Sequence, residues 1–270
     1  LAEYEAALAE KERELGAEHP SLFVPICELS DLYDILAKYE QAEAMVRRAV
    51  AIQQKAFGKS HPEVANSLRA LATLYYKQKK YAEAEAEYRR AIKMIEAAHG
   101  ENHVSLEQFL DELCRVIALQ NRPADTIRPA SELIEIYRKK YGPEDLRVAI
   151  GLRKLAQSYY KMREFDEAEE LLLRALMLRE KRNDPDDDET QMDLAELLHD
   201  LGNVYASDLA FMRAEACYVR ALEVWRRQWG DTLDHEDAAQ LVFHMGQMYE
   251  AAERPVEAEE SYRKVIAIFE

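Results

Sequence analysis

Apolar residues in this chain recur three and four positions apart, and the whole pattern repeats after 42 residues. In the clearest copy, 59–100, Leu68, Leu71 and Tyr75 share one face of a helix, because residues at this spacing lie on the same side. The same shift of 42 relates Gly16, Gly58, Gly100 and Gly142, and also His19, His61 and His103. A fixed period of this size is typical of a protein built from repeated units.

Each period predicts two helices that pair through their apolar faces. The first full pair is expected near 21–36 and 40–56, and the second near 63–78 and 82–98. The chain then divides into a half repeat and six repeats, with boundaries 1–16, 17–58, 59–100, 101–142, 143–184, 185–230 and 231–270. Shifts of register fall at 182–188 and 230–236, which we expect to be loops because loops tolerate insertions.

One first-helix position carries a small residue in every repeat: Ser30, Ala72, Cys114, Ala156, Gly202 and Gly246. A small side chain there lets two helices approach closely where a larger neighbour inserts. The repeated tyrosines are expected in the core, with each hydroxyl at its edge beside a hydrogen-bond partner or water. In repeat 3, Pro123 and Pro129 fall in the second helix, which we expect to start late or kink because Pro removes a helical hydrogen bond.

Composition narrows the class of protein. Gly and Pro number only 8 each, which favours helix, and the net charge of −16 argues against binding to nucleic acid or anionic lipid. Three widely spaced cysteines imply no disulfide framework, so we expect a reducing, cytoplasmic setting. No apolar run is long enough to span a membrane. Because the chain starts without Met or a signal peptide and ends without a polar terminal helix, we expect the parent protein to continue past both ends.

The register positions of repeat 2 read Leu68, Leu71, Ala72, Tyr75, Ala84, Tyr88 and Ala91. This series resembles the tetratricopeptide repeat, and the 42-residue period with Gly-x-x-His-Pro at 16–20 and 58–62 is similar to the kinesin light chain subclass. The resemblance implies an all-α fold, a right-handed superhelix (α-solenoid) of antiparallel helix pairs. It also implies that first helices line a concave face that binds a peptide or protein, and that the chain catalyses no reaction.

The resemblance also places certain first-helix positions on the concave face. In repeats 2 to 4 the candidate binding residues are Asn66, Arg69, Thr73, Tyr76, Lys77, Arg115, Arg153, Gln157, Tyr160 and Lys161. Five of these are basic, and Asp111 is the one acidic residue at the concave positions of the same repeats. We therefore hypothesise that this groove holds an acidic peptide, with arginines as carboxylate forks and tyrosines as amphipathic walls. Alternatively, the basic side chains pair with the many glutamates and are solvated.

Two further groups of residues could carry chemistry, and each has a structural explanation. His199-Asp200 and His244 lack a nucleophile or an orienting group at a recognisable spacing, so we expect surface or interface histidines. The acidic stretch 184–188 alternates as in a calcium loop. The Gly and the terminal Glu of such a loop are missing, so we expect a solvated loop that caps the next helix.

Cysteine and tryptophan positions add two minor candidates. Cys114 and Cys217 fall at packing positions, whereas Cys27 lies on the expected concave face and is the cysteine whose reactivity we would test. Trp225 and Trp229 lie one turn apart, and are expected to cover the loop after them or to mark a second contact surface.

Together these features predict a non-catalytic scaffold that holds an acidic protein or peptide segment in the groove of repeats 2–4, without metal or cofactor. Two alternatives stay open. The chain could be the regulatory or sensor arm of a larger multidomain enzyme, with a segment of its own parent in the groove. It could also be an oligomerisation module that buries Phe243, Ile266, Ile268 and Phe269 against another copy.

Overall fold

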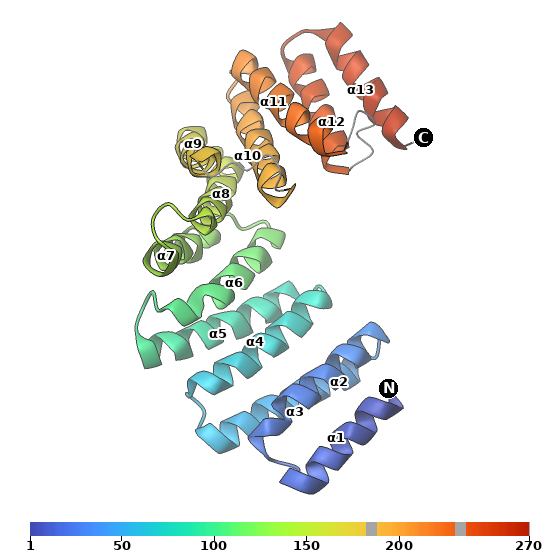
Figure 1. Ribbon diagram of the computed structural model, residues 1–270, viewed down its shortest axis with the longest axis vertical. Coiled ribbons are helices and arrows are strands. Elements are labelled where there is room, and N and C mark those ends of the chain that lie inside the picture. Colours follow the sequence, from blue (N-terminus) through green and yellow to red (C-terminus); the bar gives the residue numbers. More distant parts are fainter. Residues whose placement is uncertain (182–187, 230–235, 270) are drawn as a thin grey trace. The chain divides into compact units, whose positions relative to one another are not determined.

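The computed structural model describes residues 1–181, 188–229 and 236–269, and within these ranges the chain consists of helices joined by short turns, without a strand (Figure 1). The helices are α1 (Ala2–Leu15), η1 (Pro20–Leu22), α2 (Phe23–Ile35), α3 (Tyr39–Phe57), α4 (Pro62–Lys77), α5 (Tyr81–His99), η2 (Val104–Leu106), α6 (Glu107–Leu119), α7 (Ala124–Tyr141), α8 (Leu146–Lys161), α9 (Phe165–Lys181), α10 (Asp188–Ser207), α11 (Phe211–Trp229), α12 (Glu236–Ala251) and α13 (Pro255–Phe269). The predicted all-α class is confirmed. None of these helices has the length and apolar character needed to cross a membrane.

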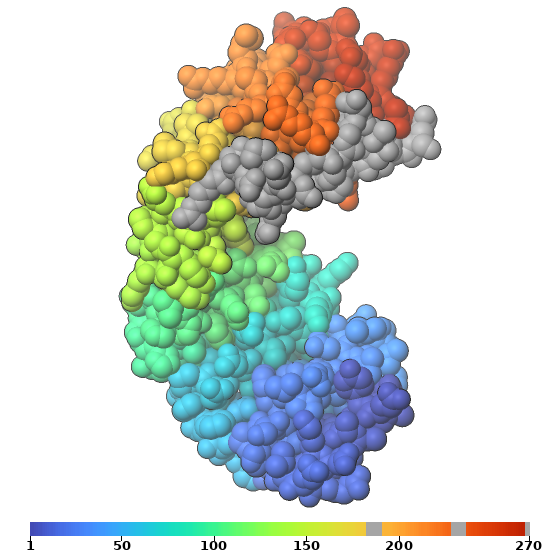
Figure 2. All heavy atoms as spheres, viewed as in Figure 1, coloured from blue at the N-terminus to red at the C-terminus, as the bar shows by residue number. Residues whose placement is uncertain are grey.

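The chain divides into two compact units, Leu1–Lys140 (unit 1) and Tyr141–Glu270 (unit 2). In unit 1, α2 packs on α3 and α4 on α5, and each pair contacts the next. In unit 2 the pairs are α8 with α9, α10 with α11 and α12 with α13. The space-filling view shows the helix pairs of unit 1 as adjacent bands that follow the sequence from blue to green (Figure 2).

The four helices predicted between 21 and 98 correspond to α2, α3, α4 and α5, with ends that differ by at most two residues. The largest difference is at the start of α2, because Pro20–Leu22 form the short 3₁₀ turn η1 before the α-helix begins at Phe23. The register residues form the core of each pair: Leu68, Ala72 and Ala84 are 0% exposed.

The repeated Gly-x-x-His segment ends one helix and begins the next. Gly58 follows α3 with φ +90°, a value that strains residues with a side chain. His61 is the N-cap of α4, and its Nδ1 accepts a hydrogen bond of 3.2 Å from the backbone N–H of Glu63. Equivalent caps are made by His19 on Ser21, His103 on Ser105 and Asp145 on Arg147. The same local turn therefore precedes the first helix of repeats 1 to 4.

The small first-helix position has the predicted role in the last two repeats. A Cβ atom added to Gly202 would lie 2.5 Å from the ring of Tyr218, and one added to Gly246 would lie 2.6 Å from the ring of Tyr262. These separations are too short for a real contact, so a larger residue at either position would require the ring to move.

The second helix of repeat 3 differs little from its equivalents despite its two prolines. It begins at Ala124, one residue later than the position equivalent to Tyr81, and it continues through Pro129 to Tyr141. The predicted late start therefore amounts to one residue. Pro129 is buried inside the helix, where its ring contributes packing while one backbone hydrogen bond is lost.

Trp225 does not form the second contact surface that was one of its two expected roles. Its side chain is 1% exposed and lies edge-on to the ring of His199, with the centroids 6.2 Å apart. Trp225 is therefore a core residue of unit 2 and not part of a contact surface. The side chains of Trp229, Ile268 and Phe269, and the acidic stretch 184–188 with its proposed cap, lie outside the described residues.

Candidate functional site

Successive first helices lie side by side in each unit and present what we call the first-helix face: α2, α4 and α6 in unit 1, and α8, α10 and α12 in unit 2. Polar side chains bridge these helices, as between α4 and α6 or between α8 and α10. Of the predicted binding residues, Asn66, Arg69, Thr73, Tyr76, Lys77 and Arg115 belong to unit 1, and Arg153, Gln157, Tyr160 and Lys161 belong to unit 2.

The basic residues of unit 1 have carboxylate partners on the same face. Arg69 donates from Nη1 to Glu112 of α6 at 3.1 Å. Lys77 donates from Nζ to Asp31 of α2 at 2.6 Å. Arg115 and Asp111 of the same helix lie 3.1 Å apart. The pairing predicted as the alternative to a basic groove is therefore present at these positions.

Four of the six predicted residues in unit 1 line one pocket. The pocket has a volume of about 120 Å³, and its walls are Thr73, Tyr76, Lys77, Tyr88, Glu112 and Arg115. The hydroxyls of Thr73 and Tyr88 lie 3.0 Å apart at its base, and Oε2 of Glu112 is buried without a hydrogen-bond partner. Lys77 and Arg115 are the exposed members at the rim, whereas Asn66 is exposed on α4 outside this lining. The pocket can accommodate one side chain.

Arg153 in unit 2 joins two first helices. Its Nε donates to Oδ2 of Asp200 at 2.6 Å, and its Nη1 donates to Glu196, both on α10. Burial lowers the pKa of the Arg153 guanidinium, but attraction to Asp200 and Glu196 outweighs burial, and the pKa is raised. Gln157 donates to the same Asp200 at 3.0 Å. These contacts hold α8 against α10.

A second pocket opens on the first-helix face of unit 2. It has a volume of about 220 Å³ and is lined by Tyr160, Asn203, Ala206, Ser207, Tyr218, His244, Gln247, Met248 and Ala251. Tyr160 lies 3.2 Å from Oγ of Ser207, and Tyr218 donates to Asn203 at 2.8 Å. Of the predicted residues in this unit, Tyr160 lines the pocket, whereas Lys161 is exposed at the end of α8.

A tetratricopeptide repeat family model matches residues 35–97 and 193–270, which is more than half of the chain, and a second model of the same description matches 148–188. The chain belongs to the tetratricopeptide repeat (TPR) family. No curated protein matches it significantly.

Solved structures show the same TPR fold. BtubC (BKLC) from P. vanneervenii is 23% identical, with a TM-score of 0.70 over 85% of this chain and 91% of that one. A putative kinesin light chain from Podosopora anserina with nearly identical TPR-like repeats is 19% identical, with a TM-score of 0.67 over 79% and 99%. The apo form of RapI is 13% identical, with a TM-score of 0.62 over 91% and 97%. At these identities the likeness shows the fold alone.

The two candidate histidines form a pair between TPR helices. Nε2 of His199 on α10 lies 2.7 Å from Nδ1 of His244 on α12, so one nitrogen donates and the other accepts. Burial, then the neighbouring His244, lowers the pKa of His199 to about 4. Burial also lowers the pKa of His244. The pair is therefore neutral at physiological pH and lies in an interface, one of the two places expected.

The Cys27 side chain is protonated at neutral pH, as its raised pKa shows. Burial, then the charges of Asp31 and Glu28, raises the pKa of the Cys27 thiol to about 12, so the nucleophilic thiolate is scarce at neutral pH. Within the described ranges, no three His, Cys, Asp or Glu side chains gather as metal ligands would.

Sequence reasoning missed a recurring polar contact between TPR repeats, which we call the inter-repeat clamp. In it, a glutamate of one second helix accepts a hydrogen bond from a tyrosine of the next first helix, and a basic side chain lies over the ring. Tyr75 donates to Glu43 at 2.9 Å, and Nζ of Lys80 lies 3.6 Å from the same carboxylate and 5.6 Å from the ring centroid. The same bond joins Tyr33 to Glu5, Tyr205 to Glu169 and Tyr249 to Glu215.

The prediction that these tyrosine hydroxyls have hydrogen-bond partners is confirmed. The sequence also contained a pattern that could have identified the glutamates as the partners. Glutamate follows the first register alanine of the second helix at Ala42-Glu43, Ala84-Glu85, Ala168-Glu169, Ala214-Glu215 and Ala258-Glu259. A charged residue that keeps its place beside a core position through five repeats indicates a contact between repeats.

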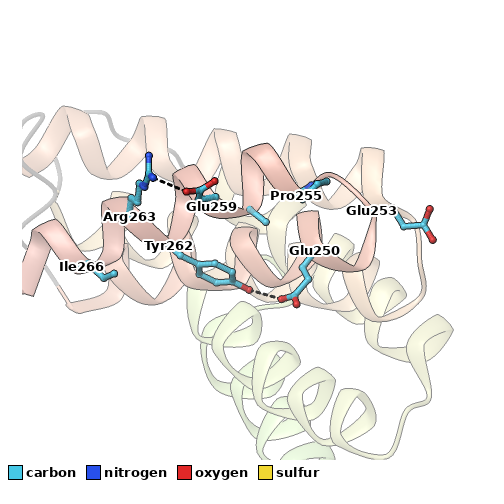
Figure 3. Close-up of a pocket in the computed structure, with 8 residues that line it drawn as sticks. Glu250, Glu253, Pro255, Glu259, Tyr262, Arg263 and Ile266 are labelled. Atoms are coloured by element: carbon cyan, nitrogen blue, oxygen red, sulfur yellow. Dashed lines mark hydrogen bonds and ion pairs between the residues drawn. The ribbon is translucent and has the colours of Figure 1, made fainter.

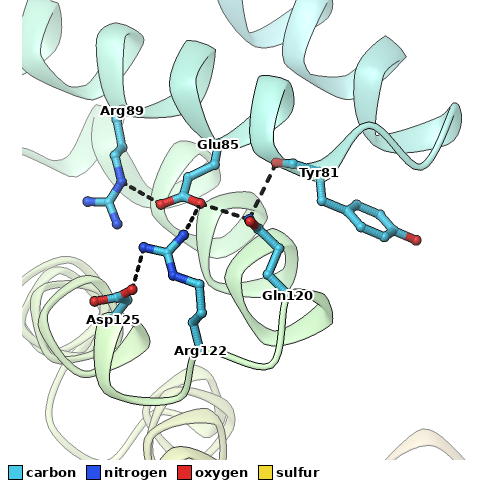
Figure 4. Close-up of polar contacts among 6 residues, drawn as sticks. All are labelled: Tyr81, Glu85, Arg89, Gln120, Arg122 and Asp125. Carbon is cyan, nitrogen blue, oxygen red and sulfur yellow. Dashed lines mark hydrogen bonds and ion pairs between the residues drawn. The ribbon is translucent and has the colours of Figure 1, made fainter.

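Repeat 3 builds the clamp from other residues, because Ile117 stands where the other repeats carry Tyr. Glu85 instead accepts hydrogen bonds from Gln120 at 2.7 Å, Arg122 at 2.8 Å and Arg89 at 2.9 Å (Figure 4). Burial raises the pKa of the Glu85 carboxyl, but these donors outweigh burial and the pKa is lowered. The glutamate and the arginine one turn after it are retained, since Arg89 is equivalent to Arg47, which donates to Glu43 at 2.8 Å; Gln120 and Arg122 take the places of the tyrosine and the lysine.

Proposed function

We propose that this chain is a non-catalytic scaffold that binds a protein segment along the first-helix face, with an acidic side chain of the partner at the pocket between α4 and α6. The TPR fold supports a protein-interaction role. The observation that carries the finer proposal is the pocket itself, because Thr73, Tyr76, Lys77 and Arg115 line it together. A carboxylate at its rim would meet two cations beside an aromatic wall.

The cations at the rim can exchange partners at little cost. In the Lys77–Asp31 pair the side chains are 43% and 61% exposed, and in the Arg115–Asp111 pair they are 55% and 23% exposed. Ion pairs at this exposure contribute about 0–1 kcal/mol, so a partner carboxylate can replace Asp31 or Asp111. Arg69 and Arg153 are less exposed than Lys77 and Arg115, so we assign them to the fold and place the ligand contacts on Lys77 and Arg115.

The test is binding of acidic, aromatic-containing peptides from an array, repeated at low and high salt. Charge reversal of the rim, Lys77→Glu with Arg115→Glu, should weaken binding at least tenfold, and high salt should weaken binding to the unmodified protein. A matched control, Arg90→Glu with Lys93→Glu, changes the net charge equally on exposed positions of the second helix α5 and should leave binding unchanged. Loss of binding in the control alone would place the ligand on the second helices and contradict the proposal.

The two alternative functions make different predictions. A sensor arm would bind a segment of its own parent chain in preference to other peptides from the array. An oligomerisation module would show a mass that rises with concentration in light scattering. The cytoplasmic location inferred from the cysteine pattern remains a prediction.

A further inference from the structure

The two pockets on the first-helix faces occupy the same place in different repeats. The pocket of unit 1 lies between the first helices of repeats 2 and 3, and the pocket of unit 2 lies between those of repeats 5 and 6. Tyr88 and Tyr218, which are equivalent residues of the second helices α5 and α11, line the two pockets. Because the helices that form them are equivalent, the pockets differ in the side chains of their lining.

Every charged side chain of the pocket in unit 1 is replaced by an uncharged one in unit 2. The replacements are Lys77 by Ser207, Glu112 by His244 and Arg115 by Gln247. The other six lining residues of the second pocket carry no charge either. Asp, Glu, Lys and Arg make up 33% of the chain, so a lining of nine residues without any of them indicates a pocket for an uncharged group.

Two other pockets of the described residues are charged. The groove along α13 has a volume of about 640 Å³, and its lining includes Glu250, Glu253, Glu259 and Arg263. There Tyr262 donates to Glu250 at 3.0 Å and Arg263 lies 2.6 Å from Glu259 (Figure 3). The pocket between α5 and α7 has three basic and two acidic residues in its lining. An uncharged lining is therefore particular to the pocket of repeats 5 and 6 and is not imposed by the fold.

The histidine of the uncharged pocket is neutral as well. Nδ1 of His244 shares a hydrogen bond with Nε2 of His199, and burial lowers the pKa of both imidazoles. Nε2 of His244 makes no hydrogen bond to the described residues. It carries an N–H when Nδ1 accepts from His199, and a lone pair when Nδ1 donates. The histidine pair can therefore offer a ligand either a donor or an acceptor without gaining a charge.

Asn203 supplies hydrogen-bond donors to the same pocket. Its Oδ1 accepts from the Tyr218 hydroxyl at 2.8 Å, which leaves its amide N–H groups for a ligand. Thr73, the equivalent residue of unit 1, lies 3.0 Å from the Tyr88 hydroxyl and has no side-chain N–H. Gln247 is exposed on α12 and carries both donors and an acceptor. The polar part of the pocket can therefore donate and accept at the same time.

The uncharged pocket is also larger than its counterpart. Ala206 stands where the ring of Tyr76 forms a wall in unit 1, and the volume is about 220 Å³ instead of about 120 Å³. Met248 and Ala251 add apolar surface beside the polar groups. The space therefore accommodates a side chain with a short apolar stem and an uncharged polar head. A carboxamide head has two donors and an acceptor, whereas a hydroxyl has a single donor.

We propose that this pocket, formed by α8, α10, α11 and α12, binds the side-chain carboxamide of glutamine. The amide oxygen accepts from Asn203, and the amide nitrogen donates to Gln247 or His244. A glutamate would bring a charge into a pocket whose lining holds no cation, and a lysine would meet no carboxylate in that lining. The site belongs to unit 2 and does not depend on the pocket between α4 and α6.

The experiment is a titration of the full chain, followed by two-dimensional NMR, with the blocked pentapeptide Ala-Ala-Gln-Ala-Ala. The side-chain amide signals of Asn203 and Gln247 should shift and saturate. The same peptide with Glu or Lys at its centre should bind roughly tenfold more weakly, because each buries an unpaired charge. Asn203→Thr copies Thr73 of unit 1, so it keeps an acceptor for the Tyr218 hydroxyl but removes the amide donors. It should weaken binding of the Gln peptide roughly fivefold.

A double substitution tests the comparison of the two pockets directly. Ser207→Lys with Gln247→Arg places the two cations of unit 1 at the equivalent positions of unit 2, and should reverse the preference from the Gln peptide to the Glu peptide. The matched control, Met177→Lys with Met212→Arg, adds the same charge at positions that are 67% and 81% exposed on α9 and α11. It should leave the preference for Gln unchanged.

The remaining outcomes separate this proposal from the others. Lys77→Glu with Arg115→Glu should not affect the Gln peptide, so the proposed function and the carboxamide pocket can fail separately. Equal affinity for the three peptides, absence of shifts at Asn203 and Gln247, or an unreversed preference in the double variant would refute the carboxamide pocket. Free glutamine distinguishes two sources of the same chemistry. An affinity equal to that of the peptide would assign the pocket to the amino acid, a weaker one would assign it to a protein segment, and both support carboxamide recognition.

Discussion

The first-helix faces of the two units use cationic residues for different purposes. In unit 2 the Arg153 side chain is 25% exposed and binds two carboxylates of the adjacent first helix. In unit 1, Lys77 and Arg115 are 43% and 55% exposed, and each pairs with a single carboxylate. The difference shows that the acidic residues of the neighbouring helix decide how exposed a basic residue on this face is and how many carboxylates it pairs with.

Among the substitutions that test this difference, removal of the Arg153 side chain is expected to change stability most. Arg153→Ala leaves Glu196 and Asp200 close together without their shared cation, and should destabilise unit 2 by about 2–3 kcal/mol. Both tryptophans of the chain, Trp225 and Trp229, belong to unit 2. Urea unfolding followed by tryptophan fluorescence therefore measures this unit specifically.

The matching substitution in unit 1 is Arg115→Ala. Because its pair with Asp111 is exposed, the change should alter stability by less than about 0.5 kcal/mol, as followed by circular dichroism. Equal losses for Arg153→Ala and Arg115→Ala would remove the distinction between a structural and an available cation.

A smaller effect is expected on the pH dependence of stability, in which the two first-helix faces again differ. His199 in unit 2 occupies the first-helix position that Arg69 holds in unit 1. Its pKa is about 4 in the folded chain, against an ordinary value of 6.5, so between these values the unfolded chain binds more protons. Stability is therefore lost as pH falls from 6.5 towards 4. The groups that face His199 are His244, Asp200 and Arg153.

Unit 2 should lose about 1–2 kcal/mol between pH 7 and pH 5, and most of this loss should disappear in His199→Gln. The measurement is urea unfolding by tryptophan fluorescence at both pH values. An identical pH dependence in the variant would mean that other groups carry the titration.

The last expected effect lies in the turns within repeats. The turn residue has φ between 54° and 64° at Ala37, Lys79, Asn121, Arg163, Leu209 and Glu253. Asn tolerates this left-handed backbone better than a branched apolar residue, and Leu209 is 71% exposed. Leu209→Asn should raise the stability of unit 2 by up to about 1 kcal/mol in urea unfolding. A loss of stability would show that the Leu209 side chain contributes packing that its exposure does not reveal.

Much of the fold could be predicted from the sequence because the 42-residue period is carried by core residues. Leu68, Ala72 and Tyr75 are buried where the pattern placed them, and the helix ends follow the Gly and His signals. The turns within repeats could not be predicted in detail, because no glycine marks the left-handed residue. That conformation is imposed by the packing of the two helices on either side.

The candidate site was harder to predict, for a different physical reason. Arg153 and Glu196 are 43 residues apart, and their contact arises only when two repeats stack. When each repeat is considered alone, Arg153 is identified as a cation, but Glu196 of the next repeat, which pairs with it, is not. Comparing the charge of each residue with that of the residues one period away would have identified both the Arg153 cluster and the inter-repeat clamp. The recurring Ala-Glu pairs are the signal for such a comparison.

The His caps have a consequence for how such a chain can grow. Gly58, His61 and the backbone N–H that His61 caps lie within six residues, so the contacts that make this turn are local in sequence. A duplicated 42-residue cassette therefore brings its own helix stop and helix start with it. Asp145 performs the same task in the fourth repeat, so a substitution at the histidine need not break the boundary. Length can thus vary by whole cassettes while each joint keeps its local geometry.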